Sequence, residues 1–208
     1  MELNVLNISG GETGRKVTLS ADVFAVEPND HVMWLDVKQI LANKRQGTHD
    51  SLEKSTISGS TRKLKRQKGT GGARAGSIKS GTMVGGARIF GPHPRDYHFK
   101  LNKKVKQLAR KCALSSKAKD NTITVVEDFN FDTPKTKQFI DILKGLKLEG
   151  TKFLLVTTDL NKNVFLSARN LTKSRILPAS DINTYDILNA KNIIMTEGSV
   201  MKLEDLLK

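Results

Sequence analysis

The run FLLVT, from Phe153 to Thr157, decides the architecture that we expect for this chain. Five consecutive residues without a charge or a glycine are typical of a strand that is buried on both faces of its sheet. Such strands occur where helices cover both sides of a parallel sheet. The elements on either side of this run therefore indicate whether the sheet is parallel.

Helical and strand patterns alternate around this run. We expect strands at residues 122–126, 176–177 and 192–195, and helical segments at 134–146, 161–171, 184–188 and from Ser199 onward. Pro134 suits the first position of a helix, where a missing N–H removes no hydrogen bond. Strands that are separated by helices pair in parallel. The sequence thus predicts an α/β fold: a three-layer αβα domain with a mostly parallel central sheet.

The N-terminal part adds a hairpin and a helix to this domain. Residues 2–8 alternate as a strand, Gly10 and Gly11 form a turn, and a second strand follows at 16–19. A helix begins at Pro28 and runs to about Lys44, with Val32, Leu35, Ile40 and Leu41 roughly on one face. We therefore expect one globular domain over residues 1–208, with a long extended loop inserted at 46–99.

An amphipathic helix follows that loop at residues 102–119. Its apolar positions repeat at helical spacing: Val105, Leu108, Ala109, Cys112 and Ala113. The other face carries lysines and arginines. Cys112, the single cysteine, lies on the apolar stripe, which predicts a buried structural thiol rather than a nucleophile.

The inserted segment, residues 46–99, is called the basic loop below. It has almost no sustained periodicity, and nine of the sixteen glycines fall between Gly59 and Gly91. A loop of this length inside a compact domain is uncommon and is usually functional or disordered. Because glycine and positive charge together oppose collapse onto a core, we expect the loop to project from the domain.

The charge of the chain is concentrated in and after this loop. Residues 61–111 hold fifteen Lys or Arg and one acid, Asp96, whereas the remainder holds twenty basic and twenty acidic residues. One quarter of the chain thus carries the whole net charge of +14. A concentrated basic block of this kind indicates a polyanionic partner.

Catalytic and cofactor sites are poorly supported. Gly69-Thr-Gly71-Gly72-Ala-Arg74 has an arginine where a dinucleotide fingerprint needs its third glycine, and no strand precedes it. The four histidines lack the cysteines or paired carboxylates of a metal set, so neither a metal nor another cofactor is expected. Glu127 and Asp128 sit at a strand end without a partner histidine. No apolar run is long enough to cross a membrane.

The composition favours RNA over DNA. Glycine lets a backbone approach phosphates closely, and Lys and Arg then displace counterions from them. No helix-turn-helix, zinc finger or other groove-reading module is visible. One alternative stays open on the residues alone: an α/β enzyme that acts on RNA or nucleotides and uses the basic loop as a substrate clamp.

Three long motifs resemble one family. RQKGTGGARAGS (66–77), FGPHPRDY (90–97) and KLNKKVKQLARKCALSSK (100–117) are similar to the bacterial large-subunit ribosomal protein L-four family, as is the lead-in ILANKRQGTHD (40–50). The resemblance covers essentially the whole chain. It implies a structural, non-enzymatic protein of the cytoplasmic ribosome that binds 23S rRNA early in assembly.

The resemblance also implies residue roles and partners. The loop would reach the constriction of the peptide exit tunnel, where it would meet the nascent polypeptide and other large-subunit proteins. The residues implied to line the tunnel are Arg66, Gln67, Lys68, Gly69, Thr70, Gly71 and Gly72. Those expected to bind rRNA are Lys44, Arg45, Arg62, Lys63, Lys65, Arg66, Lys68, Arg74, Lys79, Arg88, Arg95, Lys103, Lys104 and Lys106. Leu64 and Lys65 stand where many members have Pro-Trp, so the tip lacks that aromatic ring.

Overall fold

The computed structural model describes all residues, 1–208. The chain divides into two compact units. Residues Met1–Leu41 and Lys100–Lys208 form the first, and residues Ala42–Phe99 form the second. The first unit contains the sheet, and the second contains the whole basic loop.

A six-stranded sheet forms the centre of the first unit, in the order β2-β1-β3-β6-β4-β5. Its strands are β1 (Glu2–Leu6), β2 (Glu12–Thr18), β3 (Ile123–Val126), β4 (Phe153–Thr157), β5 (Ser174–Pro178) and β6 (Asn192–Thr196). Only β1 and β2 pair antiparallel, as a hairpin at one edge, and every other pair is parallel. The prediction of a mostly parallel sheet is therefore confirmed.

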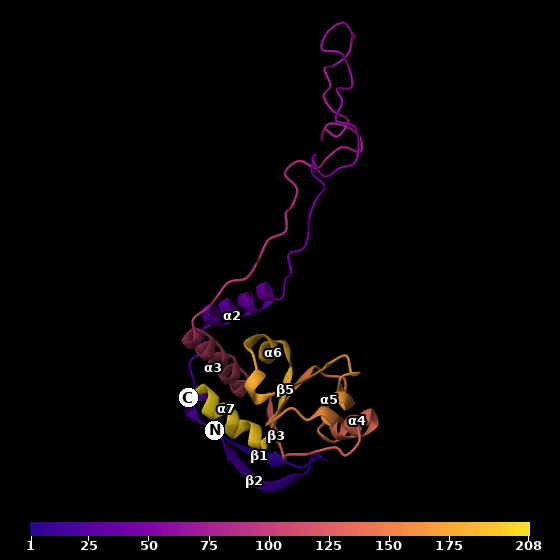
Figure 1. Cartoon of the computed structure of the whole chain (residues 1–208). Coiled ribbons are helices and arrows are strands. Elements are labelled where there is room, and N and C mark those ends of the chain that lie inside the picture. Colours follow the sequence, from indigo (N-terminus) through magenta and orange to yellow (C-terminus); the bar gives the residue numbers. More distant parts are fainter. The chain divides into compact units, whose positions relative to one another are not determined.

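Helices cover both faces of the sheet, which confirms the three-layer arrangement (Figure 1). Contacts with one face come from α1 (Ala21–Phe24), α3 (Lys103–Lys119), α6 (Thr184–Asn189) and α7 (Glu197–Leu207). The other face is covered by α4 (Thr136–Gly145) and α5 (Lys162–Ala168). A short 3-10 helix, Ala179–Asp181, links β5 to α6.

The alternation of β4 explains how one strand supports both layers. Leu154 and Val156 face the α3 side, while Phe153 and Leu155 face the α4 side, and all four are buried. Each buried side chain of this size stabilises the fold by roughly 1.5–3 kcal/mol relative to an exposed one. The run FLLVT is therefore apolar throughout because both of its faces are covered.

The helix α2 (Asp30–Asn43) departs from the prediction. It begins two residues after Pro28, and its buried residues are Met33, Asp36 and Gln39 rather than the expected apolar positions. The physical reason is a buried hydrogen bond of 2.6 Å that the Thr184 hydroxyl donates to the Asp36 carboxylate. Trp34, a large aromatic residue that its type alone would place in the core, is instead 54% exposed.

Three smaller boundaries also differ. Strand β2 begins at Glu12 rather than at residue 16, and α4 begins at Thr136, two residues after Pro134. The N-cap position of α7 is Thr196, not Ser199, and the Asp128 carboxylate accepts the Gly198 N–H at 3.1 Å. Leu206, an apolar residue of this helix that we expect from the sequence to face inward, is instead 49% exposed. The start of α7 is thus bound by a carboxylate from the end of β3, whereas the N-cap residues of α4 and α7 make no side-chain capping hydrogen bond.

Candidate nucleic-acid interface

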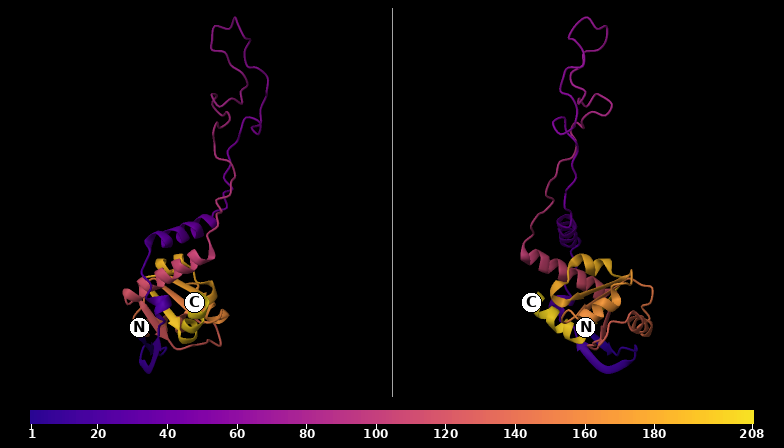
Figure 2. Two further views of the ribbon diagram at one scale, coloured as in Figure 1. Left: turned by 90° about the vertical axis from the view of Figure 1, so that its left-hand side faces the viewer. Right: turned by 45° about the vertical axis from the view of Figure 1, so that its right-hand side comes forward.

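The basic loop contains no helix or strand from residue 44 through residue 99. Its two limbs nevertheless run alongside each other, as both views in Figure 2 show. They are joined at intervals rather than along a continuous ladder. Backbone hydrogen bonds between the limbs run from the Arg95 N–H to the Gly47 carbonyl (3.2 Å), from Arg88 to Leu52 (2.9 Å) and from Leu64 to Gly76 (3.0 Å).

The base of the loop is closed around Tyr97. The Arg45 guanidinium lies 3.7 Å from the centre of the Tyr97 ring, and the Arg95 guanidinium lies 4.7 Å from it. The Tyr97 hydroxyl is 2.8 Å from His49 Nε2. A hydrogen bond from Arg95 is the main cause that holds the pKa of Tyr97 below its ordinary value of 10.0; partial desolvation opposes it, and the positive charges of Arg95 and Arg45 add smaller lowering effects. One ring thus joins residues from both ends of the loop.

Gly47 allows the two limbs to approach at this point. Its φ of +66° lies in the left-handed region, and a Cβ there would stand 2.0 Å from the Arg95 carbonyl oxygen. A glycine shortly after a helix predicts its end, but α2 already ends at Asn43, four residues before Gly47. Gly47 is therefore needed for the close approach of the limbs, and the signal in the sequence was the glycine itself.

The tip of the loop is open. All seven residues implied to line the tunnel, 66–72, are exposed. Gly69 and Gly71 have φ values of +80° and +63°, and nothing lies within 4 Å of where their Cβ atoms would be. The Lys63 ammonium donates a hydrogen bond to Gln67 Oε1. The backbone of the tip is therefore unobstructed at both left-handed glycines.

The basic side chains of the loop lack counter-charges within the chain. Of the fourteen residues expected to bind rRNA, twelve are exposed, and Lys79 and Lys106 are partly buried. None of the ion pairs in the structure involves a Lys or Arg between residues 62 and 95. The charge that the sequence concentrates here is therefore left unneutralised by the protein.

The start of α3 also carries an excess of positive charge. Lys103, Lys104 and Lys106 lie at its N-terminal end, and its first turn has no acidic residue. Positive side chains oppose the positive end of a helix dipole, at a cost of about 0.3–1 kcal/mol each at an exposed site. Their placement does not stabilise the helix, so it favours a role in binding an anion.

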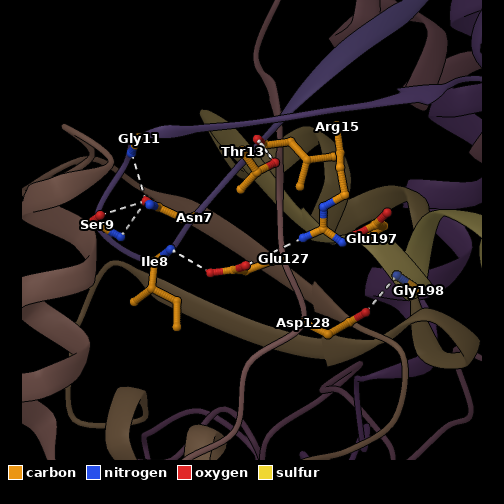
Figure 3. Close-up of polar contacts among 11 residues, drawn as sticks. Asn7, Ile8, Ser9, Gly11, Thr13, Arg15, Glu127, Asp128, Glu197 and Gly198 are labelled. Atoms are coloured by element: carbon orange, nitrogen blue, oxygen red, sulfur yellow. Dashed lines mark hydrogen bonds and ion pairs between the residues drawn. The ribbon is translucent and has the colours of Figure 1, made fainter.

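The carboxylates that follow β3 and β6, Glu127, Asp128 and Glu197, have structural partners. Figure 3 shows Arg15 of β2 between Glu197, at 2.9 Å, and Glu127, at 3.5 Å. Glu127 also accepts the Ile8 N–H at 3.4 Å, and Asp128 binds the start of α7. These groups link the β1–β2 turn to the ends of β3 and β6. Their function is therefore to hold the sheet edge together.

A polar cleft lies beside this network, at the carboxyl ends of the parallel strands. Asp128, Thr158, Asp159, Asn161 and Lys162 are among its lining residues. No histidine or cysteine lines it, and its two carboxylates already have partners, Asp128 in the Gly198 N–H at 3.1 Å and Asp159 in the Lys202 ammonium at 2.6 Å. Cys112 is buried in α3, as expected, with its Sγ 3.6 Å from the Glu27 carbonyl oxygen.

Neither a metal cluster nor a membrane-spanning helix is found. No group of three or more His, Cys, Asp or Glu side chains is placed to hold a metal ion. None of the helices is both long enough and apolar enough to span a bilayer.

The charged edge of the α/β domain has a structural role, and the long loop carries basic residues that the chain does not neutralise. Together these features define a class of proteins that bind a partner rather than catalyse a reaction. The sequence model of the Ribosomal protein L4/L1 family matches residues 17–206, and the chain belongs to this family. This confirms the resemblance that the motifs indicated.

Full-length relatives agree with this assignment. The chain is 60% identical over 207 residues to the large ribosomal subunit protein uL4 of Phocaeicola vulgatus, with all of both chains covered. It is 61% identical over 208 residues to the uL4 protein of Parabacteroides distasonis and 59% identical over 208 residues to that of Porphyromonas gingivalis, again with full coverage. The chain is therefore a structural constituent of the large subunit of the cytoplasmic ribosome and not an enzyme. The alternative of an RNA-processing enzyme is set aside.

Proposed function

We propose that the chain binds 23S rRNA early in the assembly of the large subunit. Residues 46–99 act as an extension of a single α/β domain and supply most of the contacts. The basic start of α3 supplies the rest, and other large-subunit proteins are neighbours in the assembled particle. The family to which the chain belongs supports this proposal.

The single observation that carries it is the unneutralised charge. Nine Lys or Arg between residues 62 and 95 have no carboxylate partner. Such a surface repels itself in the free protein, and that repulsion ends when phosphates approach. Each phosphate that is neutralised releases condensed counterions, which makes binding favourable and strongly dependent on salt.

The proposed role of the tip is to line the constriction of the peptide exit tunnel. The exposure of residues 66–72 and the unobstructed glycines at 69 and 71 support it. A thin segment without secondary structure can pass between RNA helices where a folded surface cannot. There the tip would contact the nascent polypeptide.

The test measures affinity for a 23S rRNA transcript as a function of salt. The variant Arg62→Gln/Lys65→Gln/Arg66→Gln should make the fall of log affinity with log salt less steep, by about 0.7–0.9 for each phosphate that the variant no longer neutralises. The matched control changes three exposed lysines outside the loop, Lys137, Lys144 and Lys162, to glutamine. The control should keep the slope of the unaltered protein.

Two results would contradict the proposal. One is an affinity of the unaltered protein that does not depend on salt. The other is a control whose slope falls as far as that of the loop variant, since the charge of the loop would then have no special role.

A further inference from the structure

Phe90 is presented in a way that does not stabilise the free chain. Its φ of +52° lies in the left-handed region, which a bulky L-residue rarely adopts. Its side chain is also fully exposed, at 103% of the reference area. The backbone is therefore strained at a position where the ring buries no surface within the chain.

The neighbouring contacts hold this segment in place. On one side of Phe90, the Arg88 N–H donates to the Leu52 carbonyl at 2.9 Å. On the other side, Gly91 packs so closely on Ser51 that a Cβ at Gly91 would stand 1.9 Å from the Ser51 hydroxyl oxygen. Residues 88 and 91 are thus fixed to residues 52 and 51 of the other limb, immediately before and after the exposed ring.

A cleft next to the ring supplies charge. It is lined by Glu53, Lys54, Ser55, Arg88, Ile89 and Phe90. The Glu53 carboxylate lies 3.1 Å from His93 Nε2 and so has a partner within the loop. Lys54 and Arg88 have no ion pair. The cleft therefore combines one flat apolar face with two unpaired cations.

We infer that this cleft binds a single unpaired nucleotide of the rRNA, with the base stacked on Phe90 and the adjoining phosphate held by Arg88 and Lys54. This inference rests on the proposed function, because it assumes that the loop contacts RNA. Aromatic rings stack on any base that is free of its helix, and Arg and Lys neutralise the backbone beside it. A base inside a duplex cannot reach the ring.

The chemistry of the rim favours a nucleotide over a protein side chain. A docking site for an apolar partner needs several adjoining apolar groups, and this cleft offers only Ile89 and Phe90 among Glu53, Lys54, Ser55 and Arg88. One ring between positive charges matches the base and phosphate of one nucleotide. A protein partner at this ring is an outcome that the experiment below separates from the inference.

The experiment uses the full chain with two replacements at the same residue. Phe90→Asn removes the ring but suits the left-handed backbone, since Asn adopts that conformation more readily than most residues. Phe90→Tyr keeps an aromatic ring. Val84→Asn is the matched control, because Val84 is an equally exposed apolar residue of the same loop that does not line this cleft.

Affinity is measured for a 23S rRNA transcript and for a fully paired RNA duplex. Loss of one base stack should weaken binding of Phe90→Asn to the transcript by roughly 5- to 100-fold. Phe90→Tyr and Val84→Asn should bind as the unaltered protein does. The salt slope of Phe90→Asn should be unchanged, whereas Arg88→Gln should lower it by about 0.7–0.9. On the duplex, Phe90→Asn should equal the unaltered protein.

The outcomes distinguish the inference from the proposal on which it rests. If the unaltered protein binds the transcript with a steep salt slope and Phe90→Asn binds equally well, the nucleotide site is wrong and the proposed function stands. Equal losses on transcript and duplex would also overturn the site, since no unpaired base would be involved. If Phe90→Asn binds the transcript normally yet is poorly incorporated into subunits, the ring contacts a protein instead. If the unaltered protein shows no salt-dependent binding, the proposed function fails first.

Discussion

Replacing Gly47 by alanine should open the base of the basic loop. The added methyl group would stand 2.0 Å from the Arg95 carbonyl oxygen, which is far inside any contact distance that carbon and oxygen tolerate. The limbs must therefore separate at this point. The left-handed φ of +66° adds a second penalty that alanine bears and glycine does not.

The size of the effect follows from two local contributions. A left-handed backbone costs an L-residue roughly 1–2 kcal/mol. Loss of the hydrogen bond from the Arg95 N–H to the Gly47 carbonyl removes about 0.5–1.5 kcal/mol. Together they shift the balance between closed and open base by roughly 1.5–3.5 kcal/mol, or about ten- to three-hundredfold. Global unfolding should not change, because the two hydrophobic cores contain no residue of the loop.

The ionisation of Tyr97 reports whether the base is closed. The chain has two tyrosines, so a Tyr185→Phe background leaves Tyr97 as the only phenol that titrates in the ultraviolet spectrum. In the closed base Arg95 and Arg45 favour the tyrosinate and hold the pKa of Tyr97 below 10.0. The closed base should consequently gain stability as pH rises through that pKa, with the full gain above 10.0, and lose that gain as pH falls. In Gly47→Ala the pKa should move toward 10.0 by the part that Arg45 contributes from the other limb, because Arg95 lies on the same limb as Tyr97.

Gly71→Ala is the matched control. Its φ of +63° imposes nearly the same backbone penalty, but nothing lies near its added methyl group. It should leave the Tyr97 titration unchanged. Identical titrations for the two variants would refute the argument, because the close approach of Gly47 to Arg95 would then have no measurable consequence.

Three further outcomes are expected. Deleting residues 61–94 should leave a cooperative thermal transition by circular dichroism, because the cores lie outside them, and loss of that transition would contradict this. Asp36→Ala should lower the free energy of unfolding in urea by about 1–3 kcal/mol, since it leaves the buried Thr184 hydroxyl without its acceptor. In a Thr184→Val background, adding Asp36→Ala should lower that free energy by less. An equal decrease in both backgrounds would show that the hydrogen bond is not the cause. Lys68 matches a position that the family resemblance links to macrolide response, so Lys68→Glu should change that response more than subunit assembly, as measured by drug sensitivity and sedimentation. The reverse pattern would exchange the proposed tip and anchor.

The fold was largely predictable because its strongest signals are local. FLLVT matches β4 at both ends, and the apolar repeat from Val105 to Ala113 identified α3. The interior of α2 was not predictable in this way. Its buried Asp36 depends on Thr184, which lies 148 residues further along the chain, and periodicity carries no information about such a partner.

The candidate interface was predictable in composition but not in arrangement. Charge and glycine content located the basic loop, and the exposure of its cations agrees with that. The closure around Tyr97 and the strained display of Phe90 depend on contacts between residues about 40 to 50 positions apart in the two limbs. Tyr97 and Phe90 both lie within FGPHPRDY, so their conspicuous aromatic character was the only available signal.

The position of β6 has a consequence for synthesis. This strand is the last of the six in the chain, yet it lies between β3 and β4 in the sheet. A polypeptide that stops before Asn192 lacks the strand that pairs with both β3 and β4, so the facing edges of these two strands should have no hydrogen-bonding partner. Premature termination should yield a chain that chaperones and proteases recognise. Truncated copies from damaged mRNA should therefore not enter assembling ribosomal subunits.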